Sequence, residues 1–161
     1  IGQASDYFGP RGLLSAMGER VFYPAIAGKK AQVIGNPDQP HSYSYIPDIA
    51  TSLVTLADHD GADGSAWHLP NAPAITTRQF VDNIYAAAGN KPQIQAISRT
   101  MVNVLGIFNG QVRELKEMLY EFEEPYIVDS SRFESTFDAH ATPLDEAIPA
   151  TVEWFRAHPR K

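Results

Sequence analysis

The stretch QPHSYSYIPDIATSLVTLA, residues 39–57, places the strongest constraint on the fold. Polar and aromatic residues alternate from His41 to Ile46, which predicts a strand, and apolar residues then recur at helical spacing. Asp48 lies at this junction, where we expect its carboxylate to cap the helix. A strand that runs directly into a helix is typical of α/β proteins, whose ligands bind beyond the carboxyl ends of the strands.

Composition limits the number of domains and the kinds of partner. A chain of 161 residues that is 43% hydrophobic predicts one core, so we expect residues 1–161 to form a single domain. The excess of 19 acidic over 13 basic residues argues against nucleic acid as a partner. The chain has no cysteine, which suits a reducing cytoplasm, and it has no apolar run long enough to cross a membrane.

Turn and cap residues predict the remaining elements. Short strands are expected on both sides of the turn at residues 35–40, within AWHLP and within PQIQAIS. Helices are expected at residues 12–22 before Pro24, between a Thr76 or Thr77 cap and Gly89, over 99–122 with a break at Asn109, and after Thr142 with a bend at Pro149.

Motifs that would carry catalysis are missing from the sequence. The five histidines are scattered without metal-ligand spacing, and no Gly-x-Ser-x-Gly motif presents a nucleophile. There is also no Gly-x-Gly-x-x-Gly phosphate cradle and no Tyr-x-x-x-Lys pair. We therefore expect neither a metal nor a catalytic residue in this chain. Because the sequence starts at Ile1 as if within a strand, we expect a fragment of a longer protein.

Three blocks in order carry a family resemblance over nearly the whole chain. ASDYFGP resembles Asn-x-Tyr-Gly-Pro, and GNPDQPHSYSYIPDIA resembles Gly-x-Gly-x-Gln-x-Arg-Asp-Phe-Val-x-Val-x-Asp-Val-Ala. TPLDEAIPATVEWFR resembles a closing segment. Together they resemble the C-terminal half of the extended short-chain dehydrogenase/reductase family, the NAD-dependent epimerase/dehydratases. The resemblance implies an α/β fold with the last Rossmann strands and a small substrate-binding lobe of short strands and helices, without the N-terminal Rossmann cofactor domain.

Site residues follow from the resemblance. Gln3 and Ala4 would face the nicotinamide, Ser5 would replace a substrate-binding Asn, and Tyr7 would belong to the conserved turn. His41 stands where the family has an Arg that holds a sugar-nucleotide diphosphate. An imidazole lacks the permanent charge and the fork of a guanidinium, so the resemblance implies a small carbonyl or hydroxyl substrate rather than a nucleotide sugar.

The strand face that carries His41 has a second explanation. Tyr43 and Tyr45 share this face, and it can be either a substrate contact or a half-buried sheet surface with polar tips in solvent. The sequence favours neither explanation over the other.

The resemblance implies the substrate-binding part of an NAD(P)-dependent epimerase, dehydratase or reductase that acts by hydride transfer. NAD or NADP would be bound by the complete protein and not tightly by this chain, which alone would be inactive. The alternative is a non-catalytic protein with the dehydrogenase fold that senses a ligand or redox state. An upstream Tyr-x-x-x-Lys pair would favour the enzyme.

The implied partners are a small-molecule substrate and the N-terminal Rossmann half, with no role for nucleic acid or a membrane. Apolar surface that the missing half would cover should also favour a homo-oligomer. We expect Ile1, Phe8 and the helix with Leu13, Leu14 and Met17 to form that surface.

Overall fold

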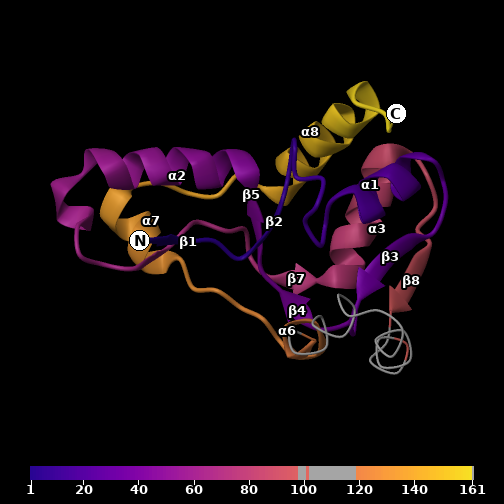
Figure 1. Cartoon of the computed structure of the whole chain (residues 1–161), viewed down its shortest axis with the longest axis horizontal. Helices are drawn as coiled ribbons and strands as arrows, with labels where there is room; N and C mark the ends of the chain where they lie inside the picture. Colours follow the sequence, from indigo (N-terminus) through magenta and orange to yellow (C-terminus); the bar gives the residue numbers. More distant parts are fainter. Residues whose placement is uncertain (98–100, 102–118, 161) are drawn as a thin grey trace.

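A computed structural model describes residues 1–97, 101 and 119–160 as a mixed α/β structure. Short strands pair across long sequence separations (Figure 1). The parallel pairs are β1 (Gly2–Gln3) with β6 (Trp67–His68), β2 (Asp6–Phe8) with β5 (Tyr43–Tyr45), and β3 (Ala31–Ile34) with β8 (Ile94–Ile97). The antiparallel pair joins β4 (Pro40–His41) to β7 (Ile75–Thr76).

Helices lie on both sides of β2 and β5 (Figure 1). The described helices are α1 (Glu19–Ile26), α2 (Ile46–Asp58), the 3-10 helix η1 (Asp60–Ala62), α3 (Thr77–Ala88), α6 (Tyr120–Glu123), α7 (Ser131–Phe137) and α8 (Leu144–Ala157). In Figure 1, α2 and α7 lie on one side, and α1, α3, β3 and β8 lie on the other. The predicted strand-to-helix junction is confirmed, because β5 passes directly into α2.

The larger hydrophobic core lies among α1, α3 and α8. Phe22 of α1 and Phe155 of α8 are fully buried, and their rings stack with centroids 4.8 Å apart and an angle of 8°. Phe80 of α3 packs edge-on against Phe8 at 4.9 Å and lies 4.3 Å from the ring of Tyr43. These contacts attach β2 and β5 to the helices.

A second, smaller cluster lies between α2, α7 and β6. Trp67, Leu69, Phe133 and Ala62 are buried there. The indole Nε1 of Trp67 donates a hydrogen bond to the Ala62 carbonyl at 3.1 Å, and the Arg132 guanidinium lies 4.0 Å from the centre of the indole ring. The described residues therefore form two apolar centres, one on each side of β2 and β5.

Residues 124–130, which we call the strap, run from α6 to α7 between the two sides (Figure 1). Its Tyr126 N–H donates to the Pro40 carbonyl at 3.0 Å, and its carbonyl accepts from the Ser42 N–H at 2.8 Å. The Val128 N–H donates to the Ser42 hydroxyl at 3.0 Å. The strap is thus hydrogen-bonded to Pro40 of β4 and to Ser42, the residue that follows β4.

The caps predicted for α3 are confirmed. The Thr76 hydroxyl accepts from the Gln79 N–H at 3.1 Å, the Gln79 side chain accepts from the Thr76 N–H at 3.0 Å, and Gly89 ends the helix with φ 76°. This reciprocal pair is a capping box, which satisfies amide groups that the first turn leaves unpaired. The predicted strand within PQIQAIS is also confirmed, as β8.

The helix predicted at residues 12–22 is confirmed only over 19–22, and the expectation that Pro24 ends it is wrong. Residues 12–18 form turns, and α1 begins at Glu19 and includes Pro24. The reason lies at Gly18, where an added Cβ would lie 2.3 Å from the Gly12 carbonyl oxygen, so the loop folds tightly against the start of the helix. The loop carbonyls of Ser15 and Leu13 accept from the N–H groups of Gly18 and Glu19.

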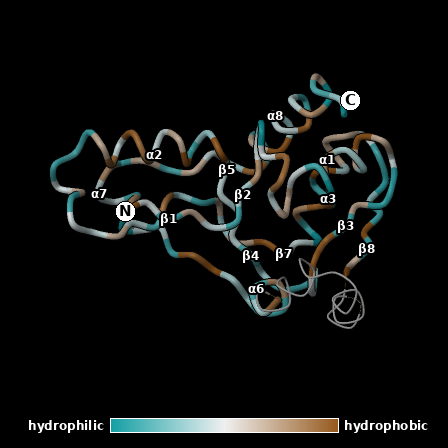
Figure 2. Tube along the Cα trace, viewed as in Figure 1, coloured by the Kyte–Doolittle hydropathy of each residue, from teal (hydrophilic) through white to brown (hydrophobic). Residues whose placement is uncertain are grey.

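The exposed apolar surface also differs from the prediction. Ile1 and Leu14 are exposed, Leu14 at 94%, but Phe8 and Met17 are buried in the larger core. Leu53 and Val54 of α2 are exposed instead. In Figure 2 apolar residues recur along α2, and of these Ile49 and Leu56 pack against the second cluster.

Two further expectations concern the second half of the chain. One of them is wrong, and the other lies largely outside the described residues. Pro149 does not interrupt α8, which runs as one helix from Leu144 to Ala157. The helix predicted over 99–122 with a break at Asn109 falls largely outside the described residues; within them, α6 covers Tyr120–Glu123.

Asp48 does not cap α2, as the sequence suggested. Its carboxylate instead accepts from the N–H and the hydroxyl of Thr142, each at 2.7 Å, and so attaches the loop before α8 to α2. The backbone explains this: the helix starts at Ile46, which puts Asp48 in the first turn rather than before it.

We expect Asp48→Ala to lower the free energy of unfolding by about 1–3 kcal/mol, because it leaves the partly buried Thr142 donors without their acceptor. Urea unfolding followed by circular dichroism measures the change. Asp58→Ala, at the other end of α2, is the control and should have little effect. Equal stability of the two variants would contradict a structural role for Asp48.

Candidate functional site

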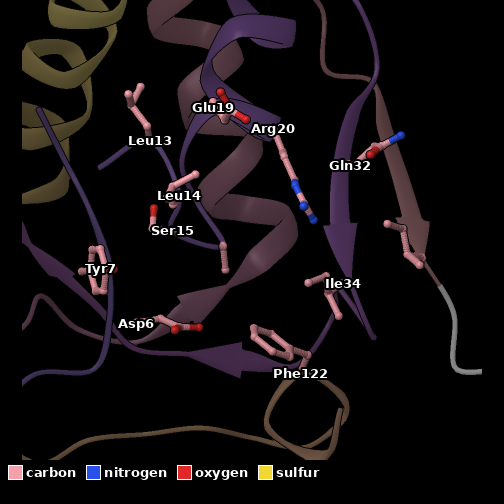
Figure 3. Close-up of a pocket in the computed structure, with 12 residues that line it drawn as sticks. Asp6, Tyr7, Leu13, Leu14, Ser15, Glu19, Arg20, Gln32, Ile34 and Phe122 are labelled. Carbon is pink, nitrogen blue, oxygen red and sulfur yellow. The ribbon is translucent and has the colours of Figure 1, made fainter. Parts of the chain in front are cut away.

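A cavity of about 360 Å³ opens between β2, the loop before α1, and the β3–β8 pair (Figure 3). It is lined by Asp6, Tyr7, Leu13, Leu14, Ser15, Ala16, Glu19, Arg20, Gln32, Ile34, Ile97 and Phe122. This wall combines apolar side chains with several polar and charged ones, and such a combination can bind and orient a small molecule.

The polar group at the β2 side of the cavity is the Asp6 carboxylate, which a buried histidine holds. His41 Nε2 lies 2.9 Å from Asp6 Oδ2, and the side chain of His41 is 3% exposed while that of Asp6 is 24% exposed. The His41 ring lies among the rings of Tyr43, Phe122 and Tyr126, with centroids 4.8, 5.9 and 4.9 Å away. His41 is therefore fixed, and it presents Asp6 to the cavity.

A second carboxylate makes this side of the site acidic. Partial burial raises the pKa of Glu121 above its ordinary value, and the nearby Asp6 charge raises that pKa further. Tyr126 of the strap has its pKa raised by burial and by the Glu121 charge. An anion that approached Asp6 would meet the same repulsion.

The structure places the site residues expected from the sequence in different surroundings. Tyr7 lines the cavity, and His41 contacts it through Asp6. Ser5 is buried, with its hydroxyl 2.8 Å from that of Ser44, and Tyr43 is buried with its hydroxyl 2.8 Å from that of Thr77. Burial raises the pKa of the Tyr43 hydroxyl well above its ordinary value. Neither Ser5 nor Tyr43 lines the cavity.

Gln3 and Ala4 are exposed at the end of β1, away from the cavity of Figure 3. Gln3 lines a separate hollow of about 220 Å³ beside Trp67 and Arg132. The expected cofactor-facing pair and the expected substrate residue Tyr7 thus lie at different hollows in the described part of the chain.

Asp6 and Arg20 are lining residues that the sequence reasoning missed. Alternation along β2 could not single out Asp6, because neighbouring residues of a strand face opposite sides and yet Asp6 and Tyr7 both line the cavity. Arg20 had no signal either, since its position depends on where α1 begins.

Neither a metal site nor a membrane span is found among the described residues. No group of three or more His, Asp and Glu side chains lies close enough to hold a metal ion within residues 1–97, 101 and 119–160. Across those same residues, no helix has the length and apolar character needed to cross a bilayer.

The start of α1 does not fit the pyrophosphate of a dinucleotide. Such a group needs free N–H groups at a helix start beside a glycine-rich turn. At α1, where Gly18 precedes the helix, the loop before it already accepts from the N–H groups of Gly18 and Glu19. The start of α1 therefore offers no dinucleotide cradle.

Solved structures share this fold, although no family model matches the sequence and no curated protein matches it significantly. UDP-N-acetylglucosamine 4-epimerase from Bacillus cereus matches 96% of this chain and 45% of its own, with TM-score 0.67 and 16% identity. dTDP-glucose 4,6-dehydratase from Bacillus anthracis in complex with NAD matches 98% of this chain and 44% of its own, with TM-score 0.71 and 15% identity.

The human epimerase family protein SDR39U1 with NADPH matches 95% of this chain and 48% of its own, with TM-score 0.69 and 20% identity. The chain thus spans less than half the length of these structures. It has the fold of the matched portion of extended short-chain dehydrogenase/reductase structures of the NAD-dependent epimerase/dehydratase kind. The fold resemblance predicted from the sequence is confirmed.

Proposed function

We propose that this chain is the substrate-binding part of an NAD(P)-dependent epimerase, dehydratase or reductase. The observation that supports it best is the cavity beside β2, where a buried histidine fixes a carboxylate at one side of a wall of apolar and polar side chains. Asp6 Oδ1 makes no hydrogen bond to the described residues, so it is free to accept one from a substrate hydroxyl.

The proposed substrate is a small hydroxyl or carbonyl compound rather than a nucleotide sugar. His41 Nε2 is already engaged with Asp6, so it is not available to a phosphate. Asp6 and Glu121 add negative charge beside it, and like charges brought together in a site cost binding energy. A neutral hydroxyl meets no such repulsion.

In the complete protein, hydride transfer would be the chemistry of the nicotinamide cofactor, bound by the half that is not in this chain. The residues described here would bind and orient the substrate and exclude water from one side of it. The absence of cysteine fits a cytoplasmic location for such an enzyme.

We expect Asp6→Asn, in the protein that combines this chain with a cofactor-binding half, to lower kcat/KM for small hydroxyl substrates about tenfold or more. Hydrogen bonds to charged groups contribute about 1.5–3 kcal/mol, and the amide removes the charge while keeping the shape. Steady-state kinetics on small alcohols, small carbonyl compounds and sugar nucleotides are the measurement. Asp138→Asn, in the exposed turn after α7, is the control.

Two results would contradict the proposal. The first is a wild-type preference for a sugar nucleotide over every small compound. The second is an Asp6→Asn variant with the kinetic constants of the wild type, which would mean that Asp6 serves only to pair with His41.

We further expect this 161-residue chain alone not to bind NAD(H) or NADP(H) with micromolar or tighter affinity, because its sequence has no Gly-x-Gly-x-x-Gly turn and the N–H groups of Gly18 and Glu19 at the start of α1 are already paired. Isothermal titration calorimetry with all four nucleotides tests this. A micromolar dissociation constant for any of them would show that the cofactor site lies within this chain.

A further inference from the structure

One cation lining the cavity has no partner within the described residues. Arg20 extends from the first turn of α1 into the cavity, on the side away from Asp6 (Figure 3). The structure gives Arg20 no ion pair or hydrogen bond to any described residue. An unpaired guanidinium beside a cavity is a binding group for an anion.

The acidic neighbour of Arg20 is already neutralised. Glu19 also lines the cavity, but its two carboxylate oxygens contact Arg160, Oε1 at 2.6 Å from Nη2 and Oε2 at 3.2 Å from Nε. The charge of Glu19 is therefore balanced from outside the cavity. The charge of Arg20 is left for a ligand.

The surroundings of Arg20 suit a small anionic group. Figure 3 shows the Arg20 side chain running toward β3, where its guanidinium lies near Ile34, with the Gln32 side chain on the same strand. The Arg20 side chain is itself exposed at the edge of the cavity, so a ligand can reach the guanidinium. The planar fork of an arginine matches the two oxygens of a carboxylate, and an amide such as Gln32 can donate as well.

We propose that Arg20 binds a carboxylate of the substrate, so that the substrate is a small hydroxy acid or the corresponding oxo acid. This inference rests on the proposed function and narrows its substrate class. Asp6, on the opposite side of the cavity, accepts from the hydroxyl, and the apolar wall covers the carbon chain between the two groups. One cation balances one carboxylate, whereas a diphosphate would bring further negative charge toward Asp6 and Glu121.

The test is a titration of the 15N-labelled 161-residue chain with 3-hydroxybutyrate and, separately, with its uncharged amide, followed by NMR. We expect the acid to shift the Arg20 Nε–Hε signal and to bind at least fivefold more tightly than the amide. Arg20→Gln should remove this preference without changing the affinity for the amide. Arg20→Lys should retain part of it, because the ammonium keeps the charge and loses the fork. Arg11→Gln is the control, since Arg11 is exposed and does not line the cavity.

The outcomes separate this inference from the proposed function. If the acid and the amide bind equally at Tyr7 and Asp6, or if Arg20→Gln keeps the preference for the acid, the Arg20 proposal is overturned and the substrate cavity stands. If neither compound shifts the signals of Tyr7 and Asp6 at any concentration, both proposals fail. The unfolding temperature of Arg20→Gln is measured as a control. If it equals that of the wild type, a loss of binding does not come from a loss of folding.

Discussion

We expect Phe155→Ala to lower the free energy of unfolding by about 3–5 kcal/mol, which is the usual cost of truncating a buried phenylalanine. Phe155 is 1% exposed, stacks on Phe22 at 4.8 Å, and meets Tyr23 edge-on at 5.0 Å. The truncation would leave a cavity where α8 joins α1. Because domains of this size are stable by only about 5–15 kcal/mol, the variant should be close to unfolding.

Urea unfolding followed by circular dichroism measures this effect. Phe155→Leu keeps most of the apolar volume and should lose less than Phe155→Ala, and Leu14→Ala, at a 94% exposed position, should change the free energy of unfolding by less than about 0.5 kcal/mol. A loss below about 1 kcal/mol for Phe155→Ala would mean that α8 contributes little to the larger core.

Trp67→Ala should cost a similar amount, about 3–5 kcal/mol, but in the second cluster. The indole is 4% exposed, contacts the ring of Phe137 at 4.9 Å, and makes the hydrogen bond to Ala62. Since the two clusters share no buried residue, we expect amide protection against hydrogen exchange to fall in α2 and α7 and to persist in α3.

Hydrogen exchange followed by mass spectrometry distinguishes the two sides. Trp154→Phe is the matched control, because the only other tryptophan lies on α8 beside the larger core. Equal loss of protection in α2 and α3 of the Trp67→Ala variant would show that the two clusters unfold as one unit.

Local signals in the sequence predicted the elements that local contacts determine. The Thr76 and Gln79 side chains cap α3 within one turn, and Gly89 ends it, so the prediction needed no distant residue. The passage from β5 into α2 was likewise visible in the change from alternation to helical spacing.

Long-range contacts decided what the sequence could not predict. Asp48 looked like a cap, but the distant Thr142 provides its donors. Pro24 and Pro149 looked like breakers, yet each lies inside a helix whose apolar face packs in the larger core. Tertiary packing of such a face outweighs the cost of a proline at these positions.

The candidate site was predictable only in part for the same reason. The resemblance pointed to Tyr7 and His41, and both adjoin the cavity. The burial of His41 depends on Phe122 and Tyr126, which come from the far end of the sequence, so alternation alone left its face undecided. Asp6 is the partly exposed member of its pair with His41, and that pair joins residues 35 positions apart, which no local pattern reveals.

The strand pairing has a consequence for the rate at which this chain reaches its structure. Three of the four described pairings are parallel, and each joins strands that lie far apart in sequence, such as Gly2 with Trp67. None of these three can start as a hairpin. Each must therefore lose the entropy of closing a long loop before the contacts between its strands can stabilise it. We expect refolding in milliseconds to seconds, with α3 formed early. The strap should join last, because it needs β4 already in place to accept its hydrogen bonds.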